Sequence, residues 1–297
     1  MTLLQVRHTT HYNYNLPVRF GEHRILVRPR DSIEQRLESF ALKIAPEPAQ
    51  LRWIHDVFGN CIAVAKFDRE SSVLRIEANM VLDHTPEMAL NFEIDDRVKT
   101  YPFLYAGEDA TDLEANVQRQ FPEQEEVTRW AQRFVNASGA TDTAGLLMTM
   151  THGIKEGFKY LRRPDPGTQT PATTLSLRQG SCRDFALLMI EAARSLGFAA
   201  RFVTGYIYSP ARDDGEHRGG GATHAWCQVY LPGAGWVEFD PTNGIIGTRD
   251  LIRVGVSRLP RQAIPIGGTF IGKKDDYIGM EVDVLVQKVR SPQDSMG

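Results

Sequence analysis

Cysteine is scarce in this chain of 297 residues, where Cys61, Cys182 and Cys227 form the whole set and no two have Cys-x-x-Cys spacing. An odd, widely spaced set argues against both a disulfide framework and a zinc site. Long apolar runs are missing too, which argues against a transmembrane helix, and the first residues lack the apolar core of a signal peptide. We therefore expect a cytoplasmic protein with free thiols.

A strong excess of charge of either sign is also lacking. The formal net charge is −3, from 34 basic and 37 acidic residues that are interspersed along the chain. Without a basic stripe or polybasic patch, neither nucleic acid nor a membrane surface is an expected partner. The chain does contain 42% hydrophobic residues, which can bury a full core, and its length suggests roughly two domains. The sequence does not indicate the oligomeric state.

Short alternating segments fill the first third of the chain. Apolar and polar residues alternate, between Pro and Gly turn signals, over 4–8, 11–14, 24–28, 39–44, 61–67 and 73–81. This pattern is typical of an antiparallel β sandwich or barrel, so we predict a β domain over residues 1–100. We assign 101–122 to a connector and 123–297 to a second domain, which includes the alternating C-terminal tail.

Helical periodicity appears in the second domain. Apolar residues recur every three or four positions over 127–135 and 147–158, and Asp142 is suited to cap the second helix. A third helix is predicted from residue 182 to 196. Strands are predicted after it, over 198–208, 223–231 and 235–240. The glycine-rich segment 213–221 between two of them is expected to form a flexible rim, and the mixture indicates an α+β fold.

One cysteine stands at the start of a predicted helix. Ser181 and Asp184 have the spacing of a capping box, which places Cys182 in the first turn. Unpaired backbone N–H groups and the helix dipole favour a thiolate there. An isolated cysteine is more often a small buried hydrophobe, so the assignment of Cys182 as a nucleophile depends on partners farther along the chain. Asp184 is predicted to be a cap that points away from the thiol.

A predicted hairpin carries a histidine and an aspartate on one face. Along 223–231, His224 shares a face with Trp226, whereas Cys227 lies on the opposite core face and is a poor nucleophile candidate. Asp240 ends the next strand. A three-residue loop pairs His224 with Asp240, and a five-residue loop makes them diagonal neighbours; both keep the side chains within about 5 to 8 Å. Such a pair supplies the imidazole and carboxylate that a nucleophilic cysteine requires.

Four motifs in this region strongly resemble those of the bacterial transglutaminase-like superfamily: Gly180-Ser-Cys-Arg-Asp-Phe-Ala, Gly197-Phe-Ala-Ala-Arg-Phe-Val-Thr-Gly-Tyr, Thr223-His-Ala-Trp and Gly235-Trp-Val-Glu-Phe-Asp-Pro-Thr. Segments of the first domain, such as His8-Thr-Thr-His-Tyr-Asn-Tyr and Asp56-Val-Phe-Gly-Asn, resemble the family's N-terminal β domain. The resemblance implies an antiparallel β-sandwich-like domain before a papain-like α+β core. It also implies Cys182 as nucleophile, His224 as general acid and base, and Asp240 as the residue that orients the histidine.

Two further residues are candidates for substrate contacts. Gln169 lies in the polar loop before the cysteine helix, and its side chain could join the backbone N–H of Cys182 in an oxyanion hole. Trp226 shares the catalytic face and could form an apolar cleft wall. The segment 256–263 departs from the Arg-Asp-Tyr-type segment of related sequences, so no substrate role is assigned to it.

The expected chemistry is acyl transfer from a peptide or protein amide through a thioester on Cys182. With water as acceptor the protein is a cysteine peptidase or amidase, which the resemblance favours; with an amine it is a protein-glutamine transglutaminase. The triad does not separate the two, because cleft shape and exclusion of water select the acceptor. A non-catalytic peptide-binding module is the alternative from another class, although such a module would typically lack part of the triad. No metal or organic cofactor is implied.

Overall fold

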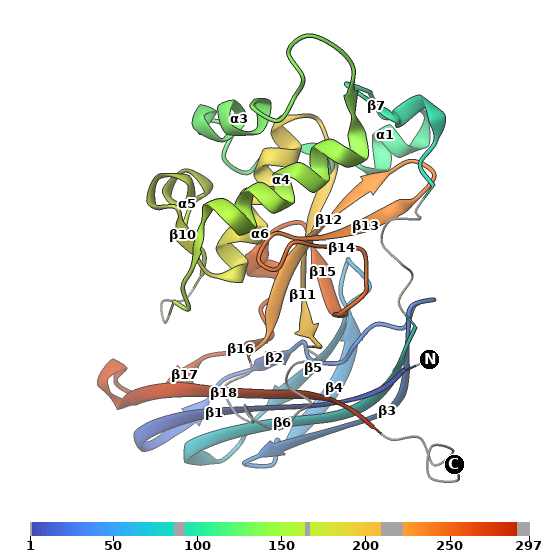
Figure 1. Ribbon diagram of the computed structural model, residues 1–297. Helices are drawn as coiled ribbons and strands as arrows, with labels where there is room; N and C mark the ends of the chain where they lie inside the picture. The colour runs from blue at the N-terminus through green and yellow to red at the C-terminus, as the bar shows by residue number, and fades with distance from the viewer. Residues whose placement is uncertain (1, 86–92, 164–166, 209–221, 290–297) are drawn as a thin grey trace.

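Two antiparallel sheets form a sandwich at one end of the molecule (Figure 1). The computed structural model describes residues 2–85, 93–163, 167–208 and 222–289. The larger sheet contains β1 (Thr2–Phe20), β3 (Gln35–Ala45), β6 (Glu70–His84), β17 (Phe270–Ile271) and β18 (Tyr277–Lys288). The smaller sheet has, in spatial order, β16 (Ile266–Gly267), β2 (His23–Ile25), β5 (Cys61–Lys66) and β4 (Gln50–His55). The β character predicted for the N-terminal region is therefore correct.

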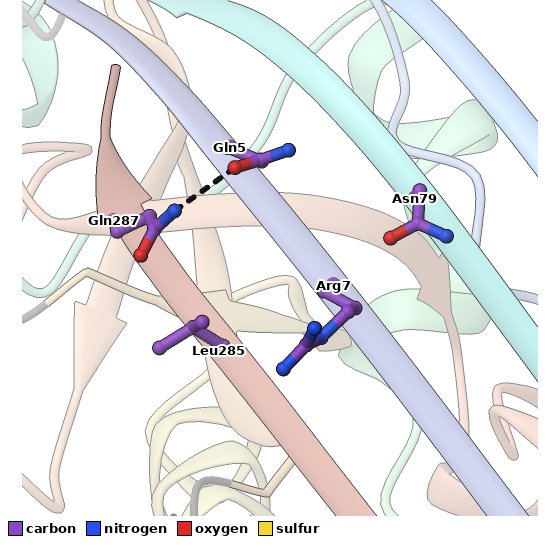
Figure 2. Close-up of a pocket in the computed structure, with 5 residues that line it drawn as sticks. All are labelled: Gln5, Arg7, Asn79, Leu285 and Gln287. Atoms are coloured by element: carbon purple, nitrogen blue, oxygen red, sulfur yellow. Dashed lines mark hydrogen bonds between the residues drawn. The ribbon is translucent and has the colours of Figure 1, made fainter. Parts of the chain in front are cut away.

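Alternation along β1 gives the larger sheet an apolar and a polar face. Leu4 and Val6 are fully buried in the core, whereas Gln5 and Arg7 lie on the outer face. Figure 2 shows a hollow on this outer face, where Gln287 donates a 2.9 Å hydrogen bond to Gln5. All the side chains that line the hollow come from β1, β6 or β18, and none is a nucleophile or a general base. The chemistry expected from the sequence lies elsewhere.

The C-terminal tail joins the sandwich, which corrects its assignment to the 123–297 domain. β18 pairs with β1 from Leu4, opposite Lys288, to Tyr14, opposite Tyr277. β17 pairs with the end of β1, and β16 pairs with β2. The alternating segment is thus a strand, as predicted, but it belongs to another sheet. Without it, the 19-residue strand β1 would expose a long unpaired edge.

A second five-stranded antiparallel sheet, in the order β14-β13-β12-β11-β15, forms the core of the other half. Its strands are β11 (Ala200–Ile207), β12 (His224–Leu231), β13 (Gly235–Asp240), β14 (Ile245–Ile246) and β15 (Leu251–Ser257). Helix α6 (Cys182–Ser195) packs against β11 and β12. Three helices contact α6 in turn: α3 (Glu125–Gln132), α4 (Thr143–Gly157) and α5 (Pro171–Leu177) (Figure 1). The arrangement is the predicted α+β core.

Helix α6 runs between this sheet and the other helices, so that its charged residues Asp184, Glu191 and Arg194 are buried. Glu191 and Arg194 form an ion pair of 3.1 Å with both side chains fully buried. Glu191 also accepts hydrogen bonds from the backbone N–H groups of Gln120 and Phe121. Because a buried carboxylate without partners is costly, these contacts fix the position of the helix and hence of its first residue, Cys182.

Short elements complete the chain: η2 (Asp96–Val98), β7 (Thr100–Tyr101), α1 (Glu108–Asp112), α2 (Glu114–Val117), β8 (Thr141–Asp142), β9 (Lys159–Tyr160), β10 (Gln179–Gly180), η4 (Pro260–Gln262) and η5 (Lys274–Asp276). Asp142 caps α4, as predicted, by accepting a 2.6 Å hydrogen bond from the N–H of Gly145. Among the helices in the described ranges, none combines the length and apolarity needed to cross a bilayer. The glycine-rich segment 213–221 lies outside the described residues.

Polar side chains attach the sandwich to the core sheet through β15. Asn60 donates to the carbonyl of Val256 at 2.7 Å and accepts from its N–H at 2.9 Å. Gln35 makes the same two-way contact with the backbone of Arg253, at 2.7 and 2.8 Å. A side-chain amide that satisfies both groups of one residue acts as an added strand partner, so β15 is held from both halves of the chain.

Candidate active site

Cys182 is the first residue of α6, and the residues around it fix the start of the helix. The backbone N–H and the hydroxyl of Ser181 both donate to the Asp184 carboxylate, each at 2.8 Å. This is the capping box that the spacing predicts. Gly180 passes so close that an added Cβ would lie 2.9 Å from the Cβ of Asp184. The Cys182 side chain thus stands at the open end of the helix and is 8% exposed.

Asp184 also holds the loop that precedes the helix. Its carboxylate accepts from Nε of Arg163 at 3.0 Å and from the backbone N–H of Gln169 at 2.6 Å. The side-chain oxygen of Gln169 accepts from the Thr174 hydroxyl at 3.1 Å. Because Asp184 is fully buried, its donors replace the water that an exposed carboxylate would bind. The loop that contains Gln169 is therefore tied to the helix that begins with Cys182.

His224 and Asp240 are in direct contact. Nε2 of His224 lies 2.7 Å from Oδ2 of Asp240. Leu231 pairs with Gly235 across the hairpin, and this register places Asp240 opposite Trp226 and diagonal to His224. The two residues are thus diagonal neighbours, the arrangement expected for a five-residue loop. The loop nevertheless has three residues, because Leu231 still belongs to the strand. Either way the two side chains lie on the same face, as parity requires.

The Cys182 thiol is a further group that acts on the charge of His224, after Asp240. Because Nε2 faces Asp240, Nδ1 is the ring nitrogen that is left to interact with the thiol. Burial by itself would lower the pKa of His224, but the charge and hydrogen bond of Asp240, together with the thiol, raise this pKa to about 10. The imidazole is consequently charged at neutral pH. A cation beside a cysteine favours its thiolate form.

Asp240 has more partners than the sequence predicts. Burial would raise its pKa, but His224, the Asn243 amide at 2.6 Å and the N–H of Thr242 at 2.9 Å together hold the pKa of Asp240 below its usual value. Nδ2 of Asn243 also lies 3.3 Å from Nε2 of His224. Asn243 was missed; the signal was its place in the Asp-Pro-Thr-Asn turn, where a side chain can fold back onto the aspartate.

Trp226 does not line a cleft, which corrects its predicted role as a substrate contact. Its side chain is fully buried and stacks on the His224 ring, with 5.7 Å between centroids. Nε1 of Trp226 donates to Glu238 at 2.5 Å. Parity placed the indole on the correct face, but that face is covered by a second apolar cluster that includes Phe58 of the sandwich and Val256 of β15. Trp226 therefore packs against the His224 ring on its buried side.

The polar contacts of Trp226, which packs against His224, continue toward the sandwich. Glu238, which receives the Trp226 indole N–H, also accepts from Arg253 and Gln228, each at 2.7 Å. Burial raises the pKa of Glu238, although these donors oppose the shift. Arg253 in turn lies 3.8 Å from Glu34. A continuous set of polar contacts thus links the catalytic face of the core sheet to the first half of the chain.

The other two cysteines occupy different environments. Cys227 is fully buried and its thiol donates to the carbonyl of Phe239 at 3.3 Å. Burial raises the pKa of Cys227 well above that of an ordinary thiol, as expected of a packing residue. Cys61 begins β5 in the sandwich and is half-buried. Cys182 is the cysteine that shares a site with His224 and Asp240, an arrangement capable of nucleophilic acyl transfer.

Two family models match this chain. The bacterial transglutaminase-like N-terminal region matches residues 4–83, and the transglutaminase-like superfamily matches residues 128–241. The second range contains Cys182, His224 and Asp240. Residues 128–241 thus belong to the transglutaminase-like superfamily, and residues 4–83 match the N-terminal region of its bacterial members.

Individual proteins are similar over long stretches. An uncharacterized protein of Mycobacterium tuberculosis is 27% identical over 299 residues, which cover 95% of this chain and 92% of the relative. An uncharacterized protein of Mycobacterium leprae is 35% identical over 113 residues, or 38% of each chain. The crystal structure of a "putative cysteine protease" from Cytophaga hutchinsonii has a TM-score of 0.73 and 17% identity, and covers 98% of this chain and 91% of its own. At that identity the likeness shows a shared fold.

Proposed function

We propose that the protein hydrolyses amide bonds of peptides or proteins through a thioester, as a cysteine peptidase or amidase. The observation that carries the proposal is the contact series from the Cys182 thiol through His224 to Asp240, in which the imidazole is charged at neutral pH. A positioned thiolate beside an imidazolium contains both the nucleophile and the proton that the leaving amine needs.

In the first step the Cys182 thiolate attacks the amide carbon, and an electron pair moves onto the carbonyl oxygen. The backbone N–H of Cys182, a first-turn group without a partner in the helix, and the side-chain amide of Gln169 would stabilise this oxyanion. Nδ1 of His224 gives its proton to the nitrogen, the C–N bond breaks, and the amine leaves. Cys182 then carries the acyl group as a thioester, and His224 is neutral.

In the second step neutral His224 takes a proton from water while the oxygen attacks the thioester carbon. The C–S bond breaks, the carboxylic acid leaves, and the thiolate–imidazolium pair is restored. Asp240 stabilises the charged ring and holds its orientation in both steps. An amine in place of water would give transglutamination through the same thioester. Since the triad is the same in both cases, an experiment is needed to identify the acceptor.

The test compares Cys182→Ser with a matched control, Cys61→Ser, on fluorescently labelled casein. We expect Cys182→Ser to lower cleavage by roughly 10³-fold or more and Cys61→Ser to leave it unchanged. Full activity in Cys182→Ser would refute the mechanism. Binding of casein without cleavage, unaffected by Cys182→Ser, would instead support a peptide-binding module.

A second measurement separates the two acceptors. The wild type is incubated with labelled casein in ¹⁸O-water, with and without a fluorescent primary amine. Hydrolysis incorporates ¹⁸O into the carboxylic acid product and is our expectation. Incorporation of the amine, with little ¹⁸O, would identify a transglutaminase.

A further inference from the structure

An exposed aromatic side chain stands next to the nucleophile and has no part in the triad. Tyr160 in β9 pairs in parallel with Gly180 in β10, two residues before Cys182. The N–H of Leu161 extends this pairing by donating to the Gly180 carbonyl at 2.8 Å. The Tyr160 ring contacts Phe185 of α6 edge-on, at 6.5 Å between centroids, yet 51% of the residue is exposed. A large, half-exposed ring is thus held beside the start of α6, where Cys182 lies.

Two arginines lie near enough to this ring to act on its charge. Arg183 follows the nucleophile directly in the chain, and Arg162 is two positions beyond Tyr160. Among the residues that the structure describes, neither arginine is in an ion pair, in contrast to Arg163, which pairs with Asp184 at 3.0 Å. Arg162 is exposed and Arg183 half-buried.

The charges of these groups act on one another. Partial burial and the Cys182 thiol raise the pKa of Tyr160, and Arg162 and Arg183 oppose the shift. Both guanidinium groups and the thiol therefore lie near enough to act on the same phenol. The segment 155–184 carries six basic and three acidic residues, although the chain as a whole has a net charge of −3. Basic residues therefore outnumber acidic ones in the stretch of chain that contains Cys182.

We propose that Tyr160, Arg162 and Arg183 form a subsite for a carboxylate carried by the substrate next to the amide that Cys182 attacks. The substrate class is an acidic peptide. Guanidinium groups bind carboxylates through paired hydrogen bonds, and the open face of the ring accommodates the aliphatic part of the same residue. Unpaired positive charge at the entrance also attracts an anionic substrate. The role of this subsite in substrate binding rests on the proposed function, but its first test does not require that function.

The first test uses two alkylating agents of similar size, iodoacetate and iodoacetamide, and measures the ratio of their rates at Cys182. His224 favours the anionic reagent in every variant, so the change in this ratio is what matters. Each removed charge near the thiol, acting through water, lowers the ratio by roughly two- to three-fold. The double variant Arg162→Gln/Arg183→Gln should therefore show roughly a five-fold lower ratio at low salt, a difference that shrinks in 0.5 M salt.

Arg249→Gln is the matched control, because Arg249 is 77% exposed and its ion-pair partner is Asp250; it should behave as the wild type. An unchanged iodoacetamide rate in the double variant shows that the site is still folded. An unchanged ratio in that variant would overturn the subsite.

The second test measures cleavage of peptide pairs that differ only in charge: a Glu against a Gln side chain, and a free against an amidated C-terminus. We expect a higher kcat/KM for the acidic member of one pair, which identifies the source of the carboxylate, and loss of this preference in the double variant. Tyr160→Ala should raise KM for both members by roughly three- to ten-fold. Equal cleavage of acidic and neutral peptides by the wild type refutes the subsite alone. Cleavage of no peptide at all refutes the proposed function, and the alkylation ratio then decides the subsite.

Discussion

Replacing Asp240 with Asn tests whether its carboxylate keeps His224 charged. The variant preserves the size of the side chain and a hydrogen-bond acceptor but removes the charge. The pKa of His224 is about 10 in the folded protein against an ordinary 6.5, which corresponds to roughly 5 kcal/mol in favour of the imidazolium. Without the carboxylate, burial is the main remaining influence and lowers this pKa. We therefore expect His224 to be neutral at pH 8 in Asp240→Asn.

The substitution changes how stability depends on pH. A group whose pKa is higher in the folded than in the unfolded state contributes stability that is fully present below the unfolded pKa and is lost as the pH rises through the folded one. For His224 that window extends from pH 6.5 to about 10. The wild type should thus lose up to roughly 5 kcal/mol relative to Asp240→Asn across the window. The lowered pKa of Asp240 reflects the same interaction and is not counted again.

The measurement is urea unfolding followed by circular dichroism at several pH values between 6.5 and 10, with histidine titration by NMR in both proteins. Asp250→Asn serves as a control, because Asp250 lies near the surface beside Arg249, and it should follow the wild type. If the difference in unfolding free energy between wild type and Asp240→Asn is the same at pH 6.5 and pH 10, the carboxylate does not hold the histidine charged and the reasoning is wrong.

Three further substitutions probe the residues around the triad. Asn243→Ala removes a donor to a buried carboxylate, so we expect a loss of roughly 1–3 kcal/mol in urea unfolding and slower casein cleavage; unchanged stability would show that the 2.6 Å contact contributes nothing. Trp226→Phe leaves a ring beneath His224 but deprives Glu238 of the indole N–H, so kinetics should show a lower kcat with little change in KM, whereas a change in KM alone would indicate direct substrate contact. Asp184→Asn weakens the cap and the loop contacts together, and should lower the unfolding free energy by roughly 2–4 kcal/mol and slow iodoacetamide alkylation of Cys182; loss of stability without slower alkylation would separate the cap from the site.

Features that depend on neighbours in the chain could be predicted. The capping box of Ser181 and Asp184 involves residues three positions apart, so the placement of Cys182 in the first helical turn followed from spacing. The shared face of His224 and Asp240 followed from the two-residue period of strands, which holds in either hairpin register. The nature of the core, helices on an antiparallel sheet, was correct for the same reason.

Contacts between distant segments could not be predicted. Nothing in the alternation of the tail indicates that β18 pairs with β1 instead of the core sheet, because a strand's own pattern does not specify its partner. Trp226 was assigned to a cleft wall, since a sequence cannot reveal that Phe58, far away in the chain, helps to cover its face. Tyr160 is brought beside Gly180, two residues before Cys182, by a two-residue parallel pairing, which is too short to leave a periodic signal.

The sequence by itself therefore determined which residues are candidates for the triad and on which side of their own helix or strand they lie, because capping and parity are local. The tertiary structure alone decided what surrounds them. It packed Trp226 against the histidine, brought Asn243 onto Asp240, and placed Tyr160 beside the start of α6, because each of these arrangements depends on how segments pack.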